Sequence, residues 1–143
     1  VTTIVLTTHY LEEADRLADR VVIIDHGLII ADDTPERLRT SLVGDRLDLR
    51  LVEAGDATQV ATAIERLDGT MSVAVDGSGV QARVVGAPAV VPGLLKALGD
   101  SGVEVASVEA IRATLDDVFL HLTGRSLREG TEGHVEDTEG VAA

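Results

Sequence analysis

Histidine is the residue type in this sequence best suited to proton transfer, because imidazole titrates near neutral pH. His9 stands out, since it follows a β-branched apolar run over residues 2–7 that predicts a buried strand. A side chain at the end of such a strand reaches the ligand crevice of an α/β sheet. Without its context, His9 would more often be a structural histidine at a strand end. No metal site is predicted, because no two histidines have zinc-ligand spacing among His9, His26, His121 and His134.

Motifs that grip a nucleotide phosphate are missing from the sequence. A phosphate loop needs a Gly-Lys pair followed by Ser or Thr, yet the one lysine, Lys96, follows Leu95. No serine lies in a Gly-x-Ser-x-Gly nucleophile motif either. The chain by itself is therefore not expected to hold a nucleotide.

Composition narrows the classes of partner. The 143 residues carry a formal net charge of −13, which argues against nucleic acid and against anionic lipid. There is no cysteine, so a disulfide framework and a thiolate metal site are excluded. No apolar run approaches the roughly 18–20 residues that cross a bilayer. The chain starts at Val1, inside the predicted strand, without a signal peptide's basic start, and this predicts a truncated piece of a longer protein.

The first 43 residues predict a strand, a helix, a hairpin and a second helix. Apolar residues at positions 11, 14, 17 and 18 predict one buried helix face, with the acidic run at 12, 13 and 15 in solvent. The run Val21–Ile24 predicts a strand, Asp25 to Gly27 a tight turn, and residues 28–31 the returning strand. Thr34 is predicted to cap a helix that has Pro35 at its first position.

From Asp45 onward the pattern is β-α-β-β-α-β, which predicts a ferredoxin-like sandwich. Alternating residues over 47–51 form its first strand, and Asp56 is predicted to cap its first helix. Met71, Val73 and Val75 mark the second strand. A final helix is predicted to begin at Thr114 and to end at Gly124, and a disordered acidic tail follows.

The ordered string Thr7–Gly27, followed by the Thr-Pro-Glu helix at Thr34, resembles the switch-histidine region of ABC ATPases. In that family a strand ends in a His before a Glu- and Ala-rich helix, and a strand, a hairpin and a Thr-Pro-Glu helix follow. The resemblance implies that His9 is a catalytic and nucleotide-binding residue. It would hydrogen-bond the γ-phosphate and help hold the attacking water. The catalytic glutamate would then lie upstream of Val1.

The family's other motifs are absent, including the Ser-Gly-Gly signature, since no two glycines are adjacent. The run Val21–Asp25 imitates a Walker B strand, but His26 follows where the family has an acid, and the run comes after His9. Asp25 is therefore interpreted as a turn residue. ATP and Mg²⁺ are expected only in the intact parent protein. For this fragment alone we expect neither a bound cofactor nor ATPase activity.

A second resemblance indicates which branch of the ABC ATPase family the chain is similar to. The segment Thr114–Arg125 is similar to the closing helix of ATP-binding subunits from drug-resistance (daunorubicin-type) ABC exporters. It implies an ATPase piece over residues 1–43, an accessory domain with a terminal helix over 44–124, and the tail over 125–143. It also implies two partners, a membrane-spanning permease and a second ATP-binding subunit. The protein would lie on the cytoplasmic face of the cell membrane, bound through the permease and not inserted itself.

An alternative function remains open from the sequence. Small β-α-β-β-α-β units also resemble non-enzymatic sensor domains, which bind a ligand between paired copies. No cluster of converging polar residues in 45–124 marks such a ligand site. Transport by an ABC exporter is therefore the first hypothesis and regulatory ligand sensing the second.

Overall fold

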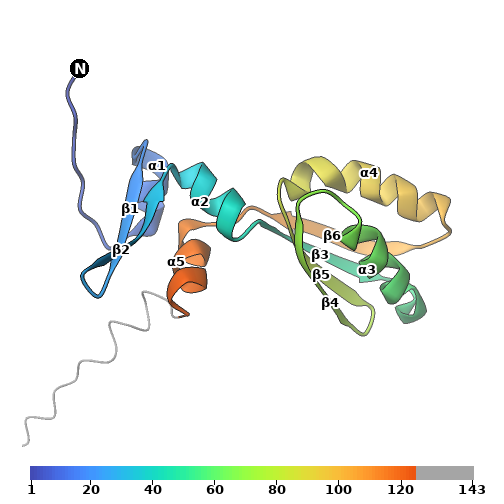
Figure 1. The fold of residues 1–143 in the computed structure, drawn as a ribbon. Coiled ribbons are helices and arrows are strands. Elements are labelled where there is room, and N and C mark those ends of the chain that lie inside the picture. The colour runs from blue at the N-terminus through green and yellow to red at the C-terminus, as the bar shows by residue number, and fades with distance from the viewer. Residues whose placement is uncertain (125–143) are drawn as a thin grey trace, which may run out of the picture.

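The computed structural model describes residues 1–124, and the predicted acidic tail lies outside the described residues. Its fold is mixed α/β with two antiparallel sheets, arranged as two bodies side by side (Figure 1). Each body surrounds its own apolar cluster of Val, Leu, Ile and Ala, and Phe119 is the aromatic member. Within residues 1–124, no helix is long and apolar enough to span a membrane.

The first body is built on a β-hairpin. Strands β1 (Val21–Asp25) and β2 (Leu28–Asp33) pair antiparallel, as predicted. Their two-residue turn has positive φ at both positions, 48° at His26 and 76° at Gly27, which matches the twist of a tight hairpin. Asp25 is the last residue of β1 and pairs with Leu28, so the turn itself consists of His26 and Gly27, one residue shorter than the predicted turn Asp25–Gly27.

Three helices cover the inner face of this hairpin: α1 (Leu11–Leu17), α2 (Pro35–Leu42) and α5 (Leu115–Thr123). The caps predicted for α2 and α5 are confirmed. Thr34 Oγ1 accepts a hydrogen bond from the Arg37 amide at 3.3 Å. Thr114 and Asp117 form a reciprocal capping box at the start of α5, and Gly124 ends that helix with φ +72°.

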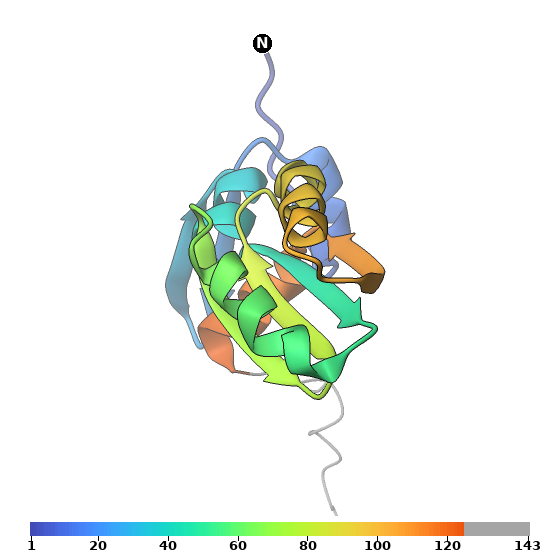
Figure 2. The same ribbon diagram turned by 90° about the vertical axis from the view of Figure 1, so that its right-hand side faces the viewer.

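The second body is a four-stranded antiparallel sheet in the order β4-β5-β3-β6. Its strands are β3 (Asp45–Leu51), β4 (Thr70–Asp76), β5 (Gly79–Val84) and β6 (Val105–Ile111). Helices α3 (Ala57–Glu65) and α4 (Ala87–Asp100) cover one face, as Figure 2 shows, and the other face is open. The ferredoxin-like arrangement itself stays a prediction.

Two local predictions differ from the structure. Leu17 is 73% exposed, because α1 ends there and turns only its earlier apolar residues and Ala18 inward. Asp56 makes no side-chain cap, since the 3₁₀ turn Ala54–Asp56 leads directly into α3. Met71 belongs to strand β4, as predicted, and lies at a β-bulge where the register shifts between Thr70 and Ser72. The extra residue leaves the inward alternation and Met71 is 45% exposed.

The two bodies meet at the segment Val43–Asp45. Gly44 has φ +70°, and a Cβ on it would lie 2.9 Å from Met71 Sδ, so only glycine fits without displacement. The buried carboxylate of Asp45 accepts from the Ala87 amide at 3.2 Å and from the Ala113 amide at 3.1 Å. It thereby ties the start of α4 and the approach to α5 to the first residue of β3.

Helix α5 packs with the hairpin and α2 rather than with the four-stranded sheet. Its buried residues share the cluster of Val21, Ile23 and Leu38. Helix α5, at the C-terminal end of the predicted accessory domain, thus packs against the segment before Gly44 and stabilises it. The division of the chain at 43/44 stays a prediction.

Candidate functional site

His9 lies at a solvent-exposed bend ahead of α1. Residues 1–7 form no strand in this structure, contrary to the sequence prediction, and the side chains of Val1, Ile4 and Val5 are exposed. A strand requires a neighbour for its backbone N–H and C=O groups, and no described strand lies beside these residues. His9 therefore follows an unpaired segment here, and its assignment as a catalytic residue stays a prediction.

The backbone next to His9 is fixed by its neighbours. Thr8 Oγ1 accepts from the Tyr10 amide at 3.0 Å and donates to Glu13 Oε2 at 3.0 Å. These bonds hold the turn into α1, so that His9 is anchored on its C-terminal side. On its N-terminal side the segment projects away from the first body (Figure 1).

Helix α1 is held in place by an ion pair that sequence reasoning missed. Arg39 in α2 is 8% exposed and donates through Nη1 to Asp15 Oδ1 in α1. The sequence pattern places Asp15 in a solvated acidic run with Glu12 and Glu13, and no pattern indicates a partner for Arg39. Only the packing of α1 across α2 brings these two groups together.

The hairpin presents an apolar face to solvent on the side opposite the helices. Ile24 and Ile29 are cross-strand partners and both are exposed. Val22 and Leu28 are exposed as well. Removing apolar surface from water is favourable. This outer hairpin face and the apolar residues before His9 therefore form a surface that another protein segment could cover.

One strong pair holds the rim of this hairpin. Arg20 donates to Asp32 through Nε at 2.6 Å and through Nη2 at 2.9 Å. The hydrogen bond from Arg20 lowers the pKa of Asp32, and the same bond raises the pKa of Arg20. Both groups are solvent-exposed, so the pair orders the surface more than it stabilises the fold.

The described residues do not fit a Mg²⁺-ATP complex by themselves. Lys96 pairs with Asp100 on α4 at 3.1 Å and lies outside the first body. Within residues 1–124, no three His, Asp or Glu side chains are placed to hold a metal ion.

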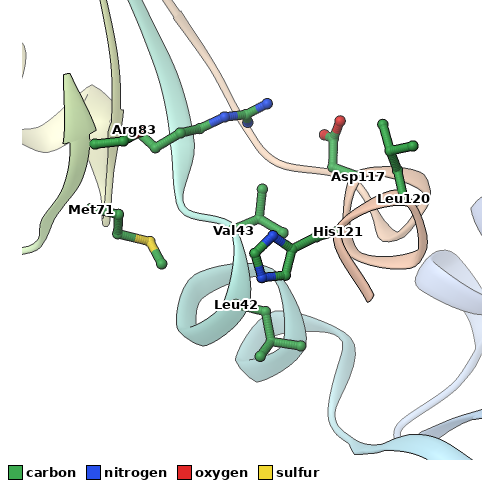
Figure 3. Close-up of a pocket in the computed structure, with 8 residues that line it drawn as sticks. Leu42, Val43, Met71, Arg83, Asp117, Leu120 and His121 are labelled. Carbon is green, nitrogen blue, oxygen red and sulfur yellow. The ribbon is translucent and has the colours of Figure 1, made fainter. Parts of the chain in front are cut away.

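The other histidines are not brought to His9. His26 occupies the hairpin turn, with Nδ1 3.0 Å from Asp25 Oδ2. His121, on α5, is exposed and lines a groove between the two bodies (Figure 3). His134 lies outside the described residues.

Comparison with known proteins gives a consistent set of relatives. The family described as "ATP-binding protein DrrA1-3-like, C-terminal domain" matches residues 34–123. The chain is 43% identical over 128 residues to the daunorubicin resistance ATP-binding protein DrrA3 of Streptomyces coeruleorubidus, covering 89% of this chain and 40% of that protein. It is 37% identical over 145 residues to the daunorubicin/doxorubicin resistance ATP-binding protein DrrA of Streptomyces peucetius, covering 99% of this chain and 43% of that protein.

A more distant relative is named for the export of a different compound. The Nod factor export ATP-binding protein I of Ralstonia nicotianae is 36% identical over 132 residues, which cover 89% of this chain and 38% of that protein. The chain thus spans about two fifths of the length of the curated relatives it matches.

Proposed function

The chain belongs to the family of C-terminal domains of DrrA1-3-like ATP-binding proteins, and on this basis we propose that it is the C-terminal portion of an ABC exporter's ATP-binding subunit. The subunit couples ATP hydrolysis to export of a drug or another hydrophobic compound. The residues that bind ATP and Mg²⁺ belong to the part of the subunit outside this chain. The proposal includes a permease and a second ATP-binding subunit as partners, at the inner face of the cell membrane.

The supporting observation is the uncovered apolar surface around His9. The unpaired segment 1–7 and the outer hairpin face together expose Ile4, Val5, Ile24 and Ile29. A nucleotide-binding core that offers a strand to residues 1–7 and an apolar surface to the hairpin would cover both. Such pairing would also turn His9 into a residue at the end of a buried strand, where ligands of α/β sheets bind.

Residues 44–124 form, in this proposal, a ferredoxin-like accessory domain with a terminal helix. The strand order β4-β5-β3-β6 and the two helices on one face support that arrangement. Helix α5 packs on α1 and α2, so it would carry any movement of the accessory domain to the helix that follows His9. The domain therefore stabilises or regulates the ATP-binding part.

The test uses the longer polypeptide that contains a phosphate loop upstream of Val1. His9→Ala is expected to lower its kcat for Mg²⁺-dependent ATP hydrolysis by about 100-fold or more, the range of a positioned acid–base group. The matched control is His121→Ala, an exposed histidine on α5 that is expected to leave kcat unchanged. An unchanged kcat in His9→Ala would overturn the role of His9, as would steady ATP turnover by the 143-residue chain alone.

A further inference from the structure

Arg39 contacts both the junction between the two bodies and the helix that follows His9. Its backbone carbonyl accepts from the amides of Val43 at 3.2 Å and Gly44 at 2.9 Å, at the end of α2. Its side chain donates through Nη1 to Asp15 Oδ1 in α1, which lies next to α2 in the first body (Figure 1). A single residue of α2 thus connects the junction to α1.

The ion pair between Arg39 and Asp15 lies between helices, since the two side chains are only 10% and 27% exposed. Arg39 Nε has no hydrogen-bond partner in the part of the chain that the structure describes. A buried guanidinium with one donor left over carries a desolvation cost that two packed apolar side chains would avoid. Stability alone therefore does not account for this pair. What it offers beyond an apolar contact is a directed bond, because apolar contacts are non-directional.

Helix α1 has few other attachments that could set its orientation. It is seven residues long, contains no buried residue, and receives no side-chain cap from Tyr10 at its N-cap position. Helices shorter than about 12–15 residues are marginal in water without packing. Leu11, Ala14 and Ala18 pack against the cluster of the first body but are only partly buried. The orientation of α1 therefore depends on its ion pair with Arg39.

The orientation of α1 in turn sets the backbone on which the His9 side chain is carried. Thr8 Oγ1 donates to Glu13 Oε2 in α1 and accepts from the Tyr10 amide, at 3.0 Å in each case. These two bonds join the residues on either side of His9 to the first turns of the helix. A rotation of α1 against α2 would therefore move His9 as well.

We propose that Arg39 is a positioning residue for His9 and acts through Asp15. The ion pair fixes the orientation of α1, and the bonds of Thr8 transmit that orientation to the backbone of His9. The inference rests on the proposed function, in which His9 hydrogen-bonds the γ-phosphate. A displacement of about 1 Å at a catalytic group can cost about 100-fold in rate, so the orientation of α1 affects catalysis even when the fold is unchanged.

The first measurement uses the 143-residue chain and involves no nucleotide. Arg39→Met keeps an aliphatic side chain of similar length and removes the charge. We expect the amide hydrogens of α1 to exchange at least about tenfold faster in this variant, while those of β3 and β5 exchange as before. Arg37→Met is the matched control on the same helix, because the pair of Arg37 with Asp33 at 3.7 Å is solvent-exposed. It is expected to leave exchange in α1 unchanged.

The second measurement is a double-mutant cycle on the longer polypeptide that contains a phosphate loop. Arg39→Met is expected to lower kcat for Mg²⁺-dependent ATP hydrolysis by about 10–100-fold and to leave KM for ATP within about twofold. In the His9→Ala background it is expected to lower kcat no further, because its effect acts through His9. A general folding defect would lower kcat equally in both backgrounds.

A second variant covers the case in which Arg39→Met folds poorly. Asp15→Leu combined with Arg39→Met replaces the ion pair by apolar packing, which is often neutral or stabilising, so this double variant is expected to stay folded. We expect it still to lower kcat, because apolar packing does not fix one orientation of α1. Wild-type kcat and wild-type exchange in α1 would mean that the pair serves packing alone.

Three results would overturn the inference while leaving the proposed function intact. They are unchanged exchange in α1 of folded Arg39→Met, an unchanged kcat in Arg39→Met where His9→Ala lowers kcat, and equal losses from Arg39→Met in both backgrounds. An unchanged kcat in His9→Ala would instead overturn the proposed role of His9, and the positioning role of Arg39 with it. The two failures are therefore distinguishable.

Discussion

Replacing Asp45 removes a buried carboxylate that joins three separate parts of the fold. Asp45 is 8% exposed and begins β3. Its two oxygens accept from backbone amides 42 and 68 residues further along the chain, at Ala87 and Ala113. Both donors belong to buried residues, so water does not readily replace the lost acceptor. The carboxylate also stands at the positive end of the 14-residue helix α4.

The expected loss follows from these bonds. A hydrogen bond to a charged group contributes about 1.5–3 kcal/mol, and an orphaned buried donor costs about 1–3 kcal/mol. Asp45→Asn keeps one acceptor and turns an NH₂ group toward the second amide, so we expect a loss of about 1.5–3 kcal/mol. Asp45→Ala loses both bonds, and relief of carboxylate desolvation offsets part of this. We expect about 3–5 kcal/mol, a large share of the roughly 5–15 kcal/mol of a typical domain.

Urea unfolding followed by far-ultraviolet circular dichroism measures the effect, since the chain has no tryptophan. The midpoint should fall while the slope m stays constant. Asp48→Asn is the matched control on the same strand, where the carboxylate is partly exposed and pairs with Arg46. Its expected cost is within about 1 kcal/mol. If Asp45→Asn cost no more than Asp48→Asn, the junction would not depend on the Asp45 carboxylate.

Two further predictions concern a turn and a surface pair. Gly44→Ala should cost about 1–2 kcal/mol by urea unfolding, because of strain at φ +70°, while the exposed Met71 side chain, whose Sδ would lie 2.9 Å from the added Cβ, shifts away. Gly27→Ala, at φ +76° with open space around it, should cost about the same, and a clearly larger cost for Gly44→Ala would show that Met71 does not shift. For Asp32 the lowered pKa means that its contribution to stability is present above the unfolded-state pKa and is lost as pH falls through the folded-state pKa. A carboxyl ¹³C titration should show the Asp32 pKa rising in Arg20→Gln, and no rise would contradict the pairing.

Features that depend on neighbours in the sequence were predictable. The caps at Thr34 and Thr114, the tight turn after β1 and the alternation in β3 each follow from residues within a few positions of one another. Local backbone preference and side-chain periodicity are sufficient for such elements. The family resemblance of residues 114–125 is likewise carried by a contiguous string, and the relatives found by comparison agree with it.

The strand predicted before His9 depended on something that the local sequence does not contain. An apolar β-branched run has strand propensity, but its backbone groups need a paired neighbour, and none of the described strands lies beside residues 1–7. The burial of the charged groups of Asp45 and Arg39 could not be predicted for the same reason. Each residue lies in a stretch with other polar residues, and its hydrogen-bond partners are more than twenty positions away in the sequence.

The amino-acid sequence alone thus determined the order and type of the elements after His9, the caps at Thr34 and Thr114, the family and the candidate His9, because these depend on short-range chemistry. Tertiary structure alone decided which side chains meet. It placed Asp45 between α4 and α5, moved Met71 to the groove through a bulge, and set Arg83 opposite Arg46. Burial and charge compensation are properties of contacts between distant segments, so they become visible only when the chain is folded.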